Sequence, residues 1–218
     1  SNTIDLEIVI DEGKSAKIHK IKVLGNKIFP SDEIMQVFEL KEGNWFSFLS
    51  NNDRYSKEKL EGDLENLESY YLDRGYLEFS LESIQVSISQ DKRDVFITMS
   101  IFEGEKFTIN EVNVLGDMPI DEEVYQPIIE SLKDTTYSQA QITSIEEYFT
   151  SLLGNQGYTF AEVRGNPEIQ ESSNLVDLLF IIQPGNRTYA RKLHFSGNFL
   201  TNDGVLRREM RQFEGAWA

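Results

Sequence analysis

The chain has 218 residues, with 21 Lys and Arg against 37 Asp and Glu, two His and no Cys. A formal net charge of −16 argues against binding to nucleic-acid phosphates and to anionic lipid surfaces. The absence of Cys excludes disulfides, thiolate nucleophiles and zinc sites of the Cys type, and two distant His offer little for metal binding. We therefore expect no metal and no cofactor.

The hydrophobic and aromatic content, 39% and 11%, is enough to bury cores, so we expect an ordered protein. The longest nearly apolar run, residues 175–182, contains Asp177 and falls far short of the ~20 residues that a membrane-spanning helix needs. The sequence predicts no spanning helix.

A repeated pattern organises the sequence. Glu or Pro before Gly, a strand-like run, and Gly followed by Asn or Asp occur in this order at residues 12–26, 103–117 and 184–198. Tyr-Ser and Gly-Tyr pairs recur with a shift of 82, at positions 55, 75, 137 and 157. The spacing predicts three copies of one unit, the third incomplete.

The first copy begins with a predicted strand over 18–24 and a helix over 31–40, whose inward side chains are Ile34, Val37 and Phe38. Ser56 is the N-cap candidate of a second helix, and Gly75 is its predicted left-handed C-terminal cap. Apolar side chains recur along this helix at helical spacing: Leu60, Leu64, Leu67 and Tyr71. Strands over 78–90 and 94–102 complete the unit.

The second copy follows the same order, with strands over 109–115, 159–170 and 174–183. We expect Pro127 to break or restart its first helix, and Ser138 with Gln141 to form a capping box for its second. The third copy opens with a strand-like run over 191–196. The unit is therefore β-α-α-β-β.

Two helices with one apolar stripe each can cover one face of a three-stranded sheet. The sequence therefore predicts an α+β protein of tandem two-layer domains, each a mixed sheet covered by two helices on one face. A hairpin makes the second and third strands neighbours. If the third strand is central, the second is left as a free edge.

These features resemble the POTRA (polypeptide-transport-associated) domains of the Omp85 superfamily. The strand that ends in Gly-Asn, the Gly-Tyr that closes the second helix, and the segments YYLDRGY at 70–76 and VLRREMRQFEGAW at 205–217 carry the resemblance. It implies the end of a preceding POTRA domain at 1–12, a third domain at 14–104, a fourth at 105–185 and the start of a fifth at 186–218.

The resemblance also implies a function. It describes a non-enzymatic module at the periplasmic face of the bacterial outer membrane that docks unfolded outer-membrane β-barrel polypeptides and accessory lipoproteins by strand addition. The membrane would be reached only through a C-terminal barrel outside this sequence. The alternative is an articulated spacer that positions the barrel without touching substrate.

The second strand of the first copy is the leading candidate site. Ile84, Val86 and Ile88 are expected to face the helices, and four polar residues to face water: Ser83, Gln85, Ser87 and Ser89. This strand lacks the Lys and Pro that usually protect sheet edges, so it is a candidate for strand addition. The competing interpretation is an ordinary edge, or one hidden against the next domain. In the second copy we expect a blunted edge, because Arg164, Gly165 and Pro167 interrupt the equivalent strand.

An insertion over residues 45–53 lengthens the first copy and carries four large apolar side chains: Trp45, Phe46, Phe48 and Leu49. They either pack under their own domain or form a partner surface. The family resemblance also nominates Leu40, Lys41 and Ile88 for contact with a lipoprotein.

Residues 186–218 hold six basic and three acidic side chains, a local charge of +3 that fits either an acidic partner or a solvated face. Motifs of hydrolases, metalloproteases and nucleotide-binding enzymes are missing from the sequence. His19 and His194 are expected to be ordinary strand residues. We therefore expect no catalytic activity.

Overall fold

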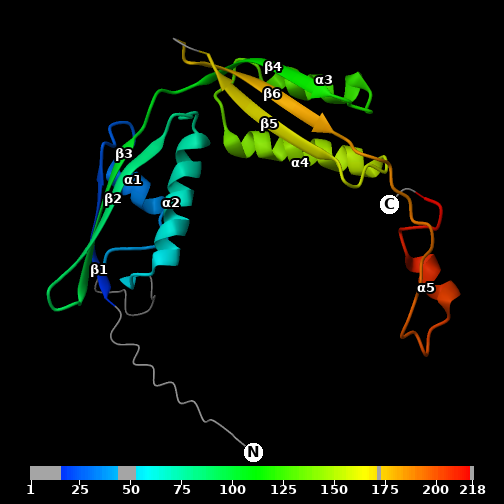
Figure 1. Cartoon of the computed structure of the whole chain (residues 1–218), viewed down its shortest axis with the longest axis horizontal. Helices are drawn as coiled ribbons and strands as arrows, with labels where there is room; N and C mark the ends of the chain where they lie inside the picture. The colour runs from blue at the N-terminus through cyan, green and yellow to red at the C-terminus, as the bar shows by residue number, and fades with distance from the viewer. Residues whose placement is uncertain (1–15, 44–52, 171–172, 217–218) are drawn as a thin grey trace, which may run out of the picture. The chain divides into compact units, whose positions relative to one another are not determined.

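The computed structural model describes residues 16–43, 53–170 and 173–216. Two compact units divide the chain, the first built from residues up to 72 and 76–105, the second from 73–75 and 106 onward. Each unit holds a three-stranded sheet. Two helices lie against one face of each sheet (Figure 1). The structure confirms the α+β, two-layer expectation.

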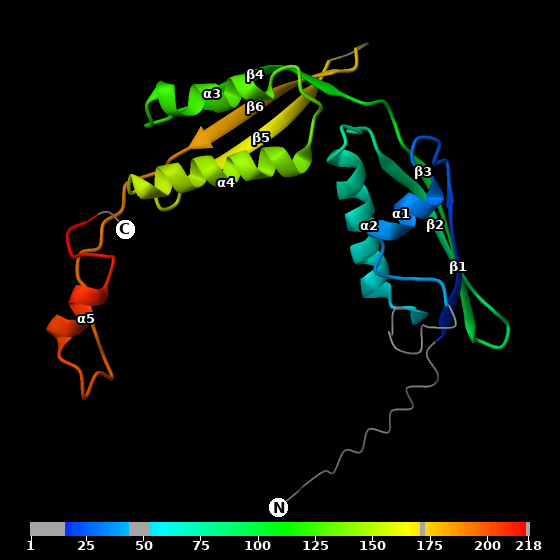
Figure 2. The same ribbon diagram turned by 180° about the vertical axis from the view of Figure 1, so that it is seen from behind.

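The first unit contains five elements in the predicted order (Figure 2): β1 (Lys17–Leu24), α1 (Ser31–Val37), α2 (Lys57–Leu72), β2 (Ser80–Ile88) and β3 (Asp94–Phe102). The strand order is β1-β3-β2, with β1 parallel and β2 antiparallel to β3. The third strand is thus central, as the free-edge expectation required.

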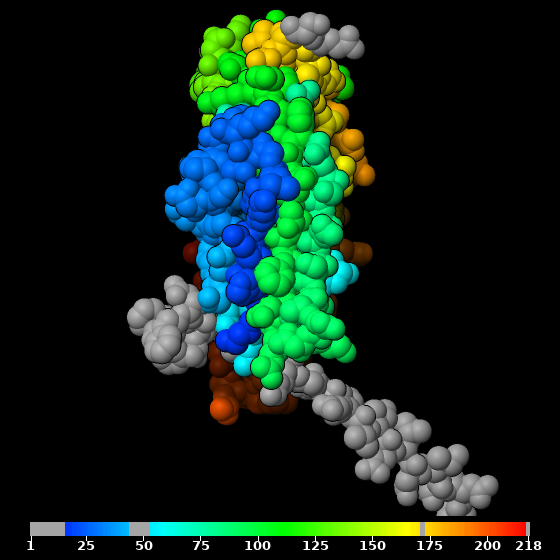
Figure 3. All heavy atoms as spheres, turned by 90° about the vertical axis from the view of Figure 1, so that its left-hand side faces the viewer, coloured from blue at the N-terminus to red at the C-terminus, as the bar shows by residue number. Residues whose placement is uncertain are grey.

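The core of the first unit lies between its sheet and its helices. Alternate side chains of β3 are buried, and apolar side chains of the two helices and of the residue after α1 are buried in the same core: Ile34, Phe38, Leu60, Leu67 and Tyr71. No described helix covers the other face of the sheet, and Figure 3 shows dark blue β1 beside the green strands on that face. Phe96 stands on this open face against His19, with ring centroids 5.0 Å apart.

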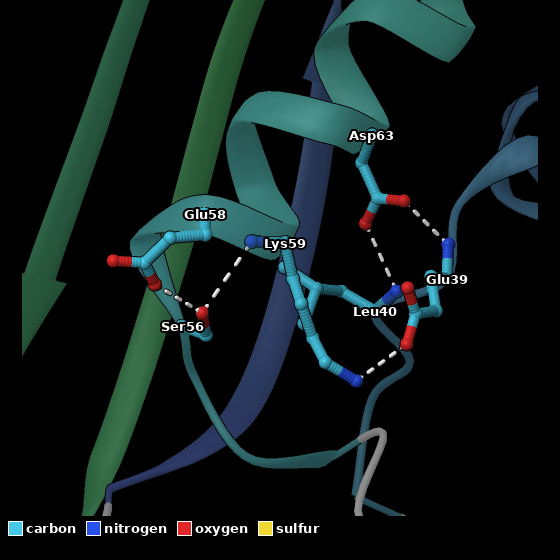
Figure 4. A network of polar contacts seen from close by, with 6 residues as sticks. All are labelled: Glu39, Leu40, Ser56, Glu58, Lys59 and Asp63. Carbon is cyan, nitrogen blue, oxygen red and sulfur yellow. Dashed lines mark hydrogen bonds and ion pairs between the residues drawn. The ribbon is translucent and has the colours of Figure 1, made fainter. Parts of the chain in front are cut away.

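Helix α1 ends at Val37, three residues earlier than expected, and a buried carboxylate explains the early end. Asp63 of α2 accepts hydrogen bonds from the backbone N–H groups of Glu39, at 2.5 Å, and Leu40, at 2.9 Å (Figure 4). Because these donors bond to Asp63, the chain leaves the helix in an extended conformation at Phe38. Asp63 therefore ties α1 to α2.

The second unit repeats the arrangement with β4 (Thr108–Gly116), α3 (Glu122–Leu132), α4 (Gln139–Asn155), β5 (Glu162–Ile169) and β6 (Leu175–Gln183). Its strand order is β4-β6-β5. Val176, Leu178, Phe180 and Ile182 of the central strand are buried against the helices.

The turn glycines after the first strands have a common physical cause. A Cβ on Gly25 would lie 2.1 Å from the Ile101 carbonyl oxygen, and a Cβ on Gly116 would lie 2.1 Å from that of Ile182. Both residues also have positive φ, +94° and +112°. The repeat therefore requires Gly where the first strand leaves the sheet.

Two expectations for the helices of the second unit have different outcomes. Ser138 caps α4, its side chain accepting the Gln141 N–H at 3.3 Å, as predicted. The expected break at Pro127 is wrong, because α3 runs through it as one helix. Pro127 removes a single backbone donor there, and Ile129 and Leu132 still anchor the helix in the core.

The third copy has α5 (Asp203–Glu209), but the expected strand over 191–196 is not assigned. A strand needs a neighbour to bond with, and the described chain places none beside it. The repeat nevertheless persists in detail. Glu214 accepts the Leu193 N–H at 3.0 Å, just as Glu42 accepts the Ile21 N–H at 3.0 Å in the first copy.

Candidate functional site

The outer edge of β1 is covered by its own chain. Gly43 donates its N–H to the Ile18 carbonyl at 2.8 Å, and Tyr55 donates to Ala16 at 3.1 Å. Together with the Glu42 contact, these bonds occupy the edge that faces away from β3. Strand β1 is therefore not available for strand addition along this stretch.

The outer edge of β4 is covered in the same way. Asp134 donates its N–H to the Ile109 carbonyl at 2.9 Å, and Ile109 donates to Thr135 at 2.8 Å. Tyr137 donates to Phe107 at 3.2 Å. In both units the segment between the two helices thus protects the first strand.

The edge of β5 is protected by two residues, Glu146 and Pro167. The Gln170 N–H donates to the Leu175 carbonyl at 3.0 Å, so even-numbered residues of β5 point their backbone groups at β6 and odd-numbered residues point outward. The outward N–H of Gly165 donates to the Glu146 carboxylate of α4 at 2.5 Å. Pro167, also outward, has no N–H. The expectation of a blunted edge is thus confirmed, whereas the expected interruption is wrong: β5 is continuous, because Pro167 faces away from the ladder.

The edge of β2 has no comparable protection. The Ser89 N–H donates to the Asp94 carbonyl at 2.8 Å, which fixes Ser83, Gln85 and Ser87 as the residues bonded to β3. The outward N–H and C=O groups are consequently those of Ile84, Val86 and Ile88. Among the residues that the structure describes, none makes a hydrogen bond to these groups.

The side chains of this strand largely follow the predicted alternation. Ile84 and Val86 are half-buried against the core. Ser83, Gln85 and Ser87 are exposed and Ser89 is half-buried. The prediction for Ile88 is wrong, because its side chain is 57% exposed at the end of the strand. Ile88 is therefore an apolar surface residue beside the open edge.

A groove that was not predicted from the sequence lies next to the start of β2. A pocket of about 290 Å³ lies between α2 and the start of β2. Its walls combine apolar side chains with two carboxylates: Leu64, Leu67, Phe79, Leu81, Glu65 and Glu68. The helical spacing of the Leu residues identified them as core, but only the position of β2 beside α2 shows that they also border a cavity.

The three residues nominated for lipoprotein contact lie in different surroundings. Leu40 is fully buried, which corrects its nomination, because a buried side chain cannot form a docking surface. Lys41 and Ile88 are exposed and lie on separate elements. The insertion at 45–53 falls almost entirely outside the described residues; its last residue, Asp53, is buried and pairs with Lys17 at 2.6 Å.

The basic side chains of residues 186–218 are partly engaged within that segment. Arg207 pairs with Glu214 at 3.0 Å and lies over the Phe195 ring, 5.2 Å from its centroid. Within the described ranges, no group of three or more His, Asp or Glu could hold a metal ion. No described helix is long and apolar enough to cross a membrane.

A family model described as POTRA, surface antigen variable number repeat, matches residues 16–104 and 107–185. Among curated proteins, the chain is 29% identical to the outer membrane protein assembly factor BamA of Neisseria meningitidis serogroup B over 216 residues. It is 32% identical to BamA of Buchnera aphidicola over 218 residues. The alignments cover 99% and 100% of this chain but only 27% and 35% of those proteins.

A solved structure supports the same assignment. The crystal structure of Haemophilus influenzae BamA POTRA3-5 superposes with a TM-score of 0.77 at 25% identity, covering 97% of this chain and 83% of that one. The curated relatives are named as assembly factors, not as enzymes. The fold, the duplicated unit and the family match agree, and the chain belongs to the POTRA family.

Proposed function

We propose that this chain is a periplasmic polypeptide-binding and scaffold segment of an outer-membrane protein assembly factor, and that β2 is its docking strand. The contrast between the sheet edges carries the proposal. Backbone donors and acceptors of Ile84, Val86 and Ile88 are unpaired among the described residues, whereas β1, β4 and β5 are protected. An extended polypeptide that pairs with this edge would satisfy all of these groups.

The proposal extends to the organisation of the chain and is supported by its similarity to BamA. Residues 14–104 and 105–185 form the third and fourth POTRA domains, 1–12 close the second, and 186–218 open the fifth. The ligands are unfolded β-barrel polypeptides, and Lys41 and Ile88 contribute to a lipoprotein contact. The module works at the periplasmic face of the outer membrane, without a cofactor, and the membrane is reached through a barrel that follows.

We expect the affinity of the proposed docking to be low, because backbone hydrogen bonds supply most of it. Each added backbone hydrogen bond contributes only ~1 kcal/mol net, and the ligand loses conformational freedom when it is ordered. Three outward residues on β2 therefore support roughly micromolar or poorer affinity for a short segment. Weak, backbone-directed binding suits the passage of many different sequences.

The test is an NMR titration of this chain with an alternating apolar and polar peptide taken from a β-barrel protein. We expect amide shifts concentrated at 83–89, with residues 163–169 unaffected. The matched variant is Val86→Pro, because β5 already accommodates Pro167 at the equivalent edge position. It should remain folded and lose the response.

Equal shifts on both edges, or no shifts at all, would overturn the proposal. The spacer function would then account for the chain, since a spacer requires the two folded units but no open edge. An unchanged response in Val86→Pro would show that the peptide binds somewhere other than the β2 edge.

A further inference from the structure

The groove is bordered by α2 and, on β2, by Ser80 and Leu81, three residues before Ile84, the first residue of the open edge. If an added strand continues past Ile84 toward this end, every second side chain of it points to the face of the sheet that α2 covers. Its floor is apolar: Leu67 is 1% exposed, and Phe79 stacks on Tyr71 with ring centroids 4.2 Å apart. Leu64 also lines the groove, and like Ile84 and Val86 it is half-buried against the core of the first unit. The floor of the groove therefore offers apolar contacts to a side chain that enters it.

The rim of the groove is acidic. Glu65 and Glu68 are both exposed, and a spacing of three places them on the same side of α2. No ion pair involves either carboxylate among the described residues, although two lysines of the same helix are paired, Lys57 with Glu61 and Lys59 with Glu39 of the segment after α1. The two carboxylates at the groove can therefore pair with a basic group of a ligand without breaking an ion pair within the described residues.

The second unit lacks this combination at its edge. The shift of 82 that aligns the helices places Glu147 and Thr150 at the positions of Glu65 and Glu68. It also places Glu146 at the position of Leu64, and that carboxylate is bonded to Gly165. The acidic rim with an apolar floor therefore occurs beside the open edge.

We infer, on the basis of the proposed strand addition, that β2 selects extended segments carrying Lys or Arg at the position that enters the groove. The hydrocarbon stem of such a residue packs on Leu64, Leu67 and Phe79 while its charge reaches Glu65 and Glu68. An Asp or Glu at this position would face two like charges. Backbone pairing supplies the binding, and the rim supplies the preference among sequences.

The test uses three blocked nine-residue peptides of alternating threonine and valine, in which the central valine is replaced by lysine, norleucine or glutamate. Their affinities for the chain are measured by NMR titration at low salt. We expect the lysine peptide to bind about fivefold more tightly than the glutamate peptide, as for exposed ion pairs. The norleucine peptide should fall between them, and added salt should reduce the preference.

Two double variants with the same change of charge separate the groove from the net charge of the chain. Glu65→Gln with Glu68→Gln should reduce the lysine preference to less than about twofold. Glu122→Gln with Glu123→Gln, on the exposed start of α3, should leave it intact. Equal loss in both variants would assign the preference to overall charge and overturn the inference.

The inference and the proposed function fail in distinguishable ways. If all three peptides shift the amides of 83–89 with equal affinity, strand addition stands and the charge preference is wrong. If none of the peptides shifts these amides, strand addition itself is wrong, and the inference falls with it.

Discussion

Strands β2 and β5 occupy the same place in two copies of one fold, yet the backbone groups of the outer edge are open in β2 and protected in β5. A shift of 81 aligns Ile84 with Gly165, Val86 with Pro167 and Ile88 with Ile169. The first of the outward N–H groups is open in β2 and bonded to Glu146 in β5, and the second exists in β2 but not in β5. The two copies thus share a scaffold and differ in what the edge can accept.

The difference depends on very few residues, and they lie on two elements. Pro167 is in the strand itself, whereas Glu146 reaches the edge from α4, where α2 carries Leu64. Two copies of a repeat can therefore differ in whether the backbone groups of an edge are open while they keep the same fold. It follows that similarity of fold between two copies says little about which of them binds polypeptide.

The largest expected effect is the difference between a proline at an inward position and one at an outward position of β2. Gln85→Pro removes an N–H that bonds to β3 and should lower the free energy of unfolding of the first unit by about 3 kcal/mol. Val86→Pro removes an outward N–H and should cost less than about 1 kcal/mol, since no ladder bond is lost. Urea unfolding of the two variants measures the difference. Equal destabilisation would contradict the assigned parity.

The next effect concerns how α2 is held beside the open edge. Asp63→Ala leaves the buried N–H of Leu40 and the partly buried N–H of Glu39 without an acceptor and should destabilise the first unit by about 2–3 kcal/mol. Residue-resolved unfolding by NMR should show the second unit unchanged. Asn66→Ala, an exposed position on the same helix, is the control. A loss spread equally over both units would show that they do not unfold independently.

A smaller effect is the opening of the closed edge. Pro167→Val restores an outward N–H, and Glu146→Leu releases that of Gly165 and introduces the residue found in α2. The double variant should bind an alternating peptide at 163–169 with an affinity within about tenfold of β2, because the groups exposed would be the same. Peptide titration by NMR measures this gain. If the amides of residues 163–169 do not shift on addition of peptide, features other than these two residues prevent pairing at this edge.

The smallest effect distinguishes the acid responses of the two units. Hydrogen bonds from Gln170 and then Asn110 hold the pKa of Asp177 below its usual range, whereas the aligned residue in the first unit is Phe96. Because the pKa of Asp177 is lower in the folded than in the unfolded chain, the ionised carboxyl stabilises the second unit above the unfolded pKa of ~3.9. This contribution is lost as the pH falls from that value through the folded pKa. Asp177→Asn should flatten the acid side of the stability profile of the second unit. A profile that does not change would remove this role.

Much of the fold follows from the sequence. The Gly turns, the spacing of Leu60, Leu67 and Tyr71, and the shift of 82 between the two helix starts predict the unit and its order. The identity of the edge strand follows as well, since a hairpin and a central third strand leave no other arrangement. These features are local or periodic, which is why one sequence is sufficient to find them.

The remainder depends on contacts between distant residues. Which residues of β2 point outward is fixed by the bond from Ser89 to Asp94 at the hairpin, and alternation of side chains cannot reveal it. The exposure of Ile88 depends on where the helices stop covering the sheet, and the burial of Leu40 depends on Asp63. The sequence shows Pro167, but only the register with β6 shows that Pro167 faces outward, where it removes no hydrogen bond between the two strands.

Amide hydrogen exchange at β2, with and without an alternating peptide, tests the central claim most directly. In the free chain we expect fast exchange for Ile84, Val86 and Ile88, slow exchange for Ser83, Gln85 and Ser87, and protection of Gly165 in β5. Bound peptide should slow Ile84, Val86 and Ile88 and leave β5 as it was. Outward amides that are already protected in the free chain, or that remain fast at saturating peptide, would contradict the account.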